Sequence, residues 1–182
     1  MPPKSPPVRK TLAEVMSELE VAGTPKNVEL YRRHGAIDPI FGVPFAVLKS
    51  LAKKVKTDHP LAAALWATGN FDAMNLAPMI ADASIFTDAQ ADRWLESVRC
   101  YPAALSLATM VGQSPVASSR ARAWMTDPAE YTRTTGYDLT SVMLRDGVAL
   151  PDRKRPAREI ALHDQEGACR TSSSETSSGS CG

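Results

Sequence analysis

Basic side chains gather in the first third of this chain, although the chain as a whole is almost neutral. The 182 residues carry a formal net charge of +1, whereas the span 26–56 holds seven bases and two acids. The bases of interest are Arg32, Arg33, Lys49, Lys53, Lys54 and Lys56, with Arg120 and Arg122 further along. Guanidinium and ammonium groups in such numbers can bind the phosphates of a nucleic acid. The alternative is a solvated helix face, because charge runs are common on exposed helices.

Cysteine and histidine do not indicate metal or redox chemistry. The three cysteines are Cys100, Cys169 and Cys181. Their odd number and the lack of CxxC spacing argue against a disulfide framework and a zinc site, and the three histidines are scattered, so we expect no metal and no cofactor. The longest apolar run, residues 61–67, is far shorter than the roughly 18 residues that span a bilayer. A cytoplasmic protein without membrane contact is therefore expected.

The basic residues fall on segments with the period of an α-helix. The apolar positions of the span 45–55 are Phe45, Leu48, Leu51, Ala52 and Val55. They recur every three or four residues, which predicts an amphipathic helix with these side chains facing the core. Asp58 can then accept hydrogen bonds from the first amides of a second helix, in which residues 61–67 should be buried. A third helix is predicted over 71–81.

Short helices separated by turns are also predicted on both sides of this stretch. Thr11 with Glu14 three residues later forms a capping box, and Pro25 begins the next helix. Further helices are predicted over 88–99, over 103–111, from Ser114 to about 124, and over 129–145. Gly136 would kink or split the last of them. Helix, tight turn and helix, with no stretch of strand period, predict an all-α solenoid.

The predicted helices occupy residues 11–147, which we interpret as one domain. Residues 1–10 are rich in proline and charge, and residues 148–182 end in a Ser/Thr-rich segment. Both ends are expected to be disordered, because such compositions bury too little apolar surface to offset the entropy of ordering. A solenoid normally ends in a repeat with a polar outer face. The abrupt end of the helical pattern therefore suggests that carboxyl-terminal repeats are missing.

Four short motifs between residues 31 and 82 resemble a known family. The motifs are YRRHG at 31–35, FGVPF at 41–45, LKxLAK at 48–53 and DHxLAxALWxTG at 58–69. Together they resemble the amino-terminal half of the AlkD-like DNA alkylation repair proteins, and the similarity extends over about residues 12–147. It implies a HEAT-like α-α superhelix whose concave, basic face holds duplex DNA. Family members that act on DNA remove cationic alkylated purines by base excision.

The resemblance also implies where the chemistry would take place. Cleavage of the glycosidic bond builds positive charge on the sugar, which a carboxylate stabilises, while aromatic rings hold the cationic base. In the family, a tryptophan is followed by an aspartate and often by a second tryptophan. Here Trp94 matches, Arg99 occupies the position that the resemblance gives to the aspartate, and Tyr101 replaces the second tryptophan. Glu96 is the remaining carboxylate candidate, although a surface ion pair with Arg99 is the alternative.

The substitution at Arg99 has the wrong sign for this reaction. A positive charge about 4 Å from a developing cation costs about 4 kcal/mol at an effective dielectric constant of about 20. Two functions therefore remain open. One is a monomeric repair protein that binds duplex DNA with weak or lost N-glycosylase activity; the other is a non-catalytic scaffold that binds another protein. The DNA hypothesis depends on Arg32, Arg33 and the lysines of 49–56 lying together along one inner surface.

Overall fold

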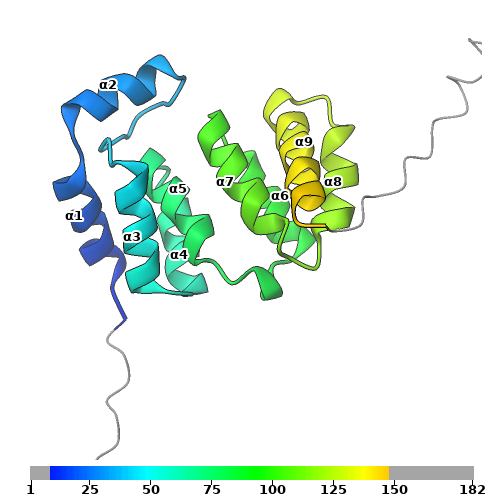
Figure 1. Ribbon diagram of the computed structural model, residues 1–182, viewed down its shortest axis with the longest axis horizontal. Coiled ribbons are helices and arrows are strands. Elements are labelled where there is room, and N and C mark those ends of the chain that lie inside the picture. The colour runs from blue at the N-terminus through cyan, green and yellow to red at the C-terminus, as the bar shows by residue number, and fades with distance from the viewer. Residues whose placement is uncertain (1–8, 148–182) are drawn as a thin grey trace, which may run out of the picture. The chain divides into compact units, whose positions relative to one another are not determined.

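The computed structural model describes residues 9–147, which form nine α-helices, one short 3-10 helix and no strand (Figure 1). The α-helices are α1 (Leu12–Ala22), α2 (Pro25–Arg33), α3 (Phe45–Val55), α4 (His59–Ala67), α5 (Phe71–Ile80), α6 (Asp88–Glu96), α7 (Tyr101–Val111), α8 (Ala117–Met125) and α9 (Glu130–Arg145). The predicted all-α fold is confirmed for this part of the chain. The expected disorder of the two ends concerns residues that lie, except for positions 9 and 10, outside the described range. Within 9–147, no helix has the length and apolar content needed to cross a membrane.

Three helix pairs, α4–α5, α6–α7 and α8–α9, follow one another at a repeat of about 29 residues, because α4, α6 and α8 begin at His59, Asp88 and Ala117. Trp66 Nε1 donates a hydrogen bond to Ser97 Oγ at 2.7 Å, and Ser119 Oγ donates to Asp88 Oδ1 at 2.7 Å; both pairs are 31 positions apart. The first bond joins α4 to the residue that caps the end of α6, and the second joins α8 to the start of α6.

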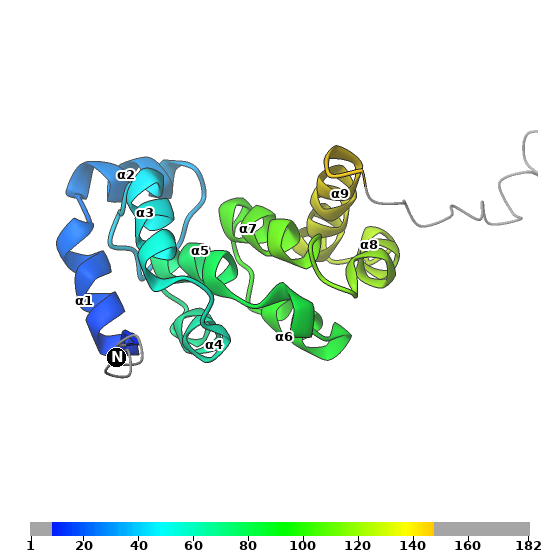
Figure 2. The ribbon, with the colours of Figure 1, turned by 60° about the horizontal axis from the view of Figure 1, so that its bottom comes forward.

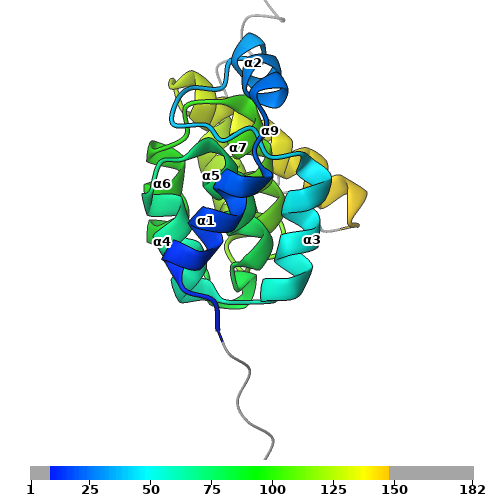
Figure 3. The same ribbon diagram turned by 90° about the vertical axis from the view of Figure 1, so that its left-hand side faces the viewer.

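The helices of these pairs form two rows. Helix α5 packs against α3 and α7, and α7 packs against α9, so that α3, α5, α7 and α9 are successive neighbours in one row. Figure 2 shows α4 and α6 on the other side of α5 and α7, and Figure 3 shows α3 on the side away from α4 and α6. Leu65, Leu76, Leu107 and Leu139 are fully buried and hold the rows together.

A buried carboxylate on α5 holds the loop that precedes α3. Asp72 is fully buried, and its two oxygens accept hydrogen bonds from three successive backbone N–H groups, those of Phe41 at 2.7 Å, Gly42 at 3.0 Å and Val43 at 2.8 Å. Hydrogen bonds to an ionised acceptor are about twice as strong as neutral ones, and the positive end of α5 adds to them. Gly42 has φ +80°, and a Cβ there would lie 2.5 Å from the Thr24 carbonyl oxygen, so only glycine fits.

Two apolar residues, one on α3 and one on α7, are exposed, although Phe45 was predicted to face the core. On α3, Leu48 and Leu51 are buried as expected, but Phe45 is 47% exposed. On α7, Leu107 is buried but Leu105 is 51% exposed. Helical spacing shows which residues share a face, but the neighbouring helices decide how much of that face is covered, and no described helix covers these two positions.

Several helix ends differ from the predicted ones. Helix α6 ends at Glu96, three residues before the predicted end, and α7 begins at Tyr101 rather than 103. Helix α8 begins at Ala117, not at Ser114, and α9 is continuous through Gly136. A Cβ at Gly136 would lie 2.5 Å from the backbone nitrogen of Met125. This glycine therefore allows α8 and α9 to approach closely, and it does not break the helix.

We expect Asp72→Asn to lower the free energy of unfolding by about 2–4 kcal/mol, because an amide has one acceptor oxygen and its NH2 would face a buried N–H group. Urea denaturation measures this difference. Asp58→Asn is the matched control: Asp58 caps α4 by accepting from the Leu61 N–H, and asparagine caps a helix equally well, so a change below about 0.5 kcal/mol is expected. Similar losses in both variants would contradict the role given to Asp72.

Candidate nucleic-acid interface

A groove with a volume of about 780 Å³ runs along the row formed by α3, α5, α7 and α9. Its lining combines cationic, small polar and apolar side chains, chiefly Phe45, Lys49 and Lys53 from α3, Pro78 and Met79 from α5, Leu105, Ser106 and Thr109 from α7, and Arg145 from α9. None of the described residues that line it is an aspartate or glutamate. A groove with cations and an apolar floor, but no carboxylate on its wall, favours an anionic ligand with apolar parts.

Two lysines form the positive edge of the groove. Lys49 and Lys53 lie one helical turn apart on α3, and both are exposed. The Lys49 Nζ atom lies 5.1 Å from the centre of the Phe45 ring, within the range of a cation–π interaction. Arg145, at the other end of the groove, forms an ion pair with its neighbour Asp146, with Nε 2.8 Å from Oδ1. The lysines on α3 are therefore the groove cations best placed to bind phosphate.

The other bases of the first third of the chain lie elsewhere. Lys54 follows Lys53 but lines a separate pocket between α1 and α3 with Val21 and Val47. On α2, the Arg32 Nη2 atom donates to both carboxylate oxygens of Asp38, at 2.8 and 2.9 Å. Arg33 is exposed at the end of α2, and Lys56 is exposed just beyond the end of α3. Of the bases expected along one inner surface, Lys49 and Lys53 line the groove, whereas Lys54, the next residue on the same helix, lines the pocket between α1 and α3.

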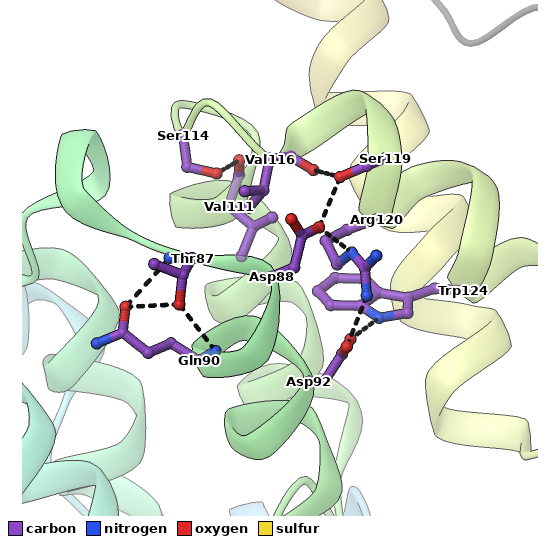
Figure 4. A network of polar contacts seen from close by, with 10 residues as sticks. All are labelled: Thr87, Asp88, Gln90, Asp92, Val111, Ser114, Val116, Ser119, Arg120 and Trp124. Carbon is purple, nitrogen blue, oxygen red and sulfur yellow. Dashed lines mark hydrogen bonds and ion pairs between the residues drawn. The ribbon is translucent and has the colours of Figure 1, made fainter.

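Arg120 belongs to a network that joins α6 to α8 (Figure 4). Its Nε atom lies 2.6 Å from Asp88 Oδ1, and its Nη1 atom lies 2.6 Å from Asp92 Oδ2. The Trp124 Nε1–H donates to the other oxygen of Asp92 at 2.8 Å. The Arg120 side chain is only 19% exposed and is engaged by two carboxylates, so its role is to hold the helices together. Arg122, two residues later, is exposed on α8.

Three of the four candidate catalytic residues, Trp94, Glu96 and Tyr101, do not lie together in one site. Trp94 is buried, and its ring stacks on that of Trp66 with centroids 4.5 Å apart and planes at 11°. Glu96, the last residue of α6, lines a different pocket, which it shares with Arg120. Tyr101 begins α7, and its hydroxyl group donates to a carboxylate oxygen of Glu130. None of the three is among the residues that line the groove.

Arg99, the fourth candidate, lies in the turn between α6 and α7. Its Nη1 atom donates to the carbonyl oxygens of Glu96 and Val98, the latter at 2.8 Å. The Glu96 carbonyl is at the carboxyl-terminal end of α6, where a cation is favoured by the helix dipole, and the Val98 carbonyl lies in the turn that follows. The predicted ion pair with the Glu96 side chain is replaced by these backbone contacts, because α6 ends at Glu96 and Arg99 does not continue the helix.

Asp138, on α9, is a carboxylic acid that was not predicted from the sequence as a candidate site residue. It lies two turns before Arg145, and residues seven positions apart share a face of a helix. Asp138 is half-buried, and this burial raises the pKa of its carboxyl group. Asp138 is not among the residues that line the groove, so no catalytic role is assigned to it.

Metal and thiol chemistry have no support in the part of the chain that the structure describes. Between residues 9 and 147, no three His, Cys, Asp or Glu side chains are grouped so that they could hold a metal ion. Cys100 is buried immediately before α7, and burial raises the pKa of its thiol. A raised pKa keeps the thiol protonated and therefore a poor nucleophile.

We expect Arg120→Met to lower the free energy of unfolding by about 1–3 kcal/mol, because it removes the charged partner of Asp88 and Asp92. Arg122→Met on the same helix should change it by less than about 0.5 kcal/mol, because Arg122 is an exposed residue. Thermal or urea unfolding followed by circular dichroism measures both. Equal effects would mean that the network does not hold α6 to α8.

Comparison with known proteins agrees with this fold. Residues 15–170 match the family model described as DNA alkylation repair enzyme. Two uncharacterized proteins, from Listeria monocytogenes and Listeria innocua, are each 24% identical to this chain over 137 residues, which are 72% of this chain and 61% of theirs. The chain therefore spans less than two thirds of the length of these relatives.

A solved structure is also similar, with 33% sequence identity and a TM-score of 0.69 over 71% of this chain and 56% of that one. It is described as a member of a new family related to the HEAT-like repeat DNA glycosylases, with affinity for branched DNA structures. The predicted HEAT-like solenoid and the AlkD-like resemblance are thus confirmed. By its sequence and by the stacked helix pairs of residues 9–147, the chain belongs to the DNA alkylation repair family.

Proposed function

We propose that this protein binds DNA along the groove of α3, α5, α7 and α9, and that it does not excise bases. The observation that carries the proposal is the pair Lys49 and Lys53 on the edge of a groove whose described lining has no carboxylate. Two neighbouring ammonium groups can bind phosphates of one strand, while the apolar floor contacts sugars and bases. The branched-DNA affinity stated for the solved relative supports DNA, including branched DNA, as the ligand.

The lack of base excision follows from the distribution of carboxylates. Excision requires a negative charge beside the sugar as the glycosidic bond breaks. Glu96 is on the wall of another pocket, and Arg99 donates to backbone carbonyls at the end of α6. Trp94 stacks on Trp66 in the core and is not available to hold a base. The proposed activity is therefore recognition of DNA within a repair pathway, without glycosidic cleavage.

A second candidate function is the binding of another protein in the same groove. The exposed side chains of Phe45 and Leu105 favour it, because exposed apolar residues are typical of protein interfaces. A protein ligand would be captured equally well after nuclease treatment. DNA binding would instead weaken steeply as the salt concentration rises, because each phosphate contact releases counterions.

For the DNA proposal, we expect the double variant Lys49→Ala/Lys53→Ala to bind DNA more weakly at low salt. The plot of log affinity against log salt concentration should also become shallower, by about 1 for each lysine that contacts a phosphate. Fluorescence anisotropy with a labelled duplex and a labelled branched DNA, measured over a series of salt concentrations, gives both quantities.

Lys54→Ala is the matched control, because Lys54 has the same charge on the same helix but lines the pocket between α1 and α3. It should leave the affinity and the salt dependence nearly unchanged. An effect of Lys54→Ala equal to that of either groove lysine would show that only the overall charge of α3 matters. An affinity of the wild type that does not depend on salt would contradict phosphate binding.

For the reaction, we expect no release of alkylated bases from methylated duplex DNA, either by the wild type or by Arg99→Asp. A carboxylate at position 99 would lie in the turn after α6 and would not face the groove. Chromatography of released purines measures the activity. Release by the wild type would contradict the proposal. A gain of activity in Arg99→Asp would restore the site assignment that the family resemblance implies.

A further inference from the structure

Two apolar side chains that line the groove are highly exposed. Phe45 is 47% exposed, whereas the next residues of its apolar stripe, Leu48 and Leu51, are 2% and 5% exposed. Leu105 is 51% exposed and lines the same groove from α7. Met79, from α5, contributes a partly buried side chain between them in the row of helices. The groove thus offers an apolar contact surface that phosphates cannot use.

The Phe45 ring has a cation–π contact with its neighbour one turn along the helix. Lys49 follows at i+4, and its ammonium nitrogen lies 5.1 Å from the ring centre. The ammonium group therefore lies over one face of the ring, and both side chains line the groove. A flat, positioned ring beside a cation suits a ligand in which an anionic backbone and a flat apolar group are adjacent.

The accessibility of base faces distinguishes forms of DNA. In a continuous duplex, each base is stacked between its neighbours, so its faces are hidden from a side chain in the groove. At a branch point the stacking is interrupted, and the faces of the terminal bases become accessible. Aromatic side chains stack on such bases, and aliphatic side chains insert between base steps.

We propose that Phe45 and Leu105 are the residues that determine preference for branched DNA, by contacting base faces exposed at the branch point. The proposal rests on the proposed function, in which Lys49 and Lys53 bind the adjacent phosphates. It assigns different tasks to residues on one stripe of α3: the lysines bind any DNA, and the phenylalanine distinguishes its form.

The test compares the binding of Phe45→Ala and Leu105→Ala to a four-way junction and to a continuous duplex of the same arm sequence, at one salt concentration. We expect each variant to weaken binding to the junction about five- to tenfold, the lower part of the range for loss of one stacked base, and to change duplex binding less than about twofold. Phe45→Trp should keep or strengthen the junction preference. Val21→Ala, at an 85% exposed apolar residue outside the groove, should change neither.

Each outcome supports or overturns the proposal. Loss confined to the junction, with normal circular dichroism, supports it. An equal loss of affinity for both DNA forms, or no loss for either, overturns it. The proposed DNA binding would still stand in that case if the Lys49→Ala/Lys53→Ala variant binds DNA poorly. A wild-type chain that binds neither form overturns the proposed function itself and leaves a protein as the ligand of the groove.

Discussion

The position of α3 depends on one buried carboxylate. Asp72 lies in the first turn of α5, and its oxygens accept hydrogen bonds from three consecutive N–H groups of the loop before α3. A buried charge is tolerated only when it is fully hydrogen-bonded, so the loop has little freedom to take another path. Because α3 begins two residues after the last of these contacts, Asp72 also fixes where Phe45 and the two groove lysines lie.

The repeated helix pairs extend this arrangement along the chain. Polar contacts join neighbouring pairs inside the array, where Trp66 donates to Ser97, and near its surface, where Arg120 bridges Asp88 and Asp92. These contacts join the helices of one row, while α3, α5, α7 and α9 form the other. The groove lies along the second row, so its walls come from residues about one repeat apart, such as Ser106 and Asn75, which hydrogen-bond to each other.

The helices could be predicted from local signals, whereas the site could not. The capping box of Thr11 and Glu14 depends on neighbours in the sequence and forms as predicted. Which side of a helix faces a partner depends on distant residues, and so Phe45 was assigned to the core and Lys54 to the same surface as Lys53. Arg99 was placed on α6, but the helix ends one turn earlier. These differences arise from tertiary packing, which a single sequence does not contain.

The central claim is that DNA lies in the groove of α3, α5, α7 and α9. Photo-crosslinking tests it most directly, with a photoreactive amino acid placed either at Thr109, which lines the groove on α7, or at Ala63, which is exposed on α4 in the other row. We predict efficient crosslinks to labelled branched DNA from position 109 and few from position 63. Equal crosslinking from both positions, or stronger crosslinking from position 63, would contradict the claim.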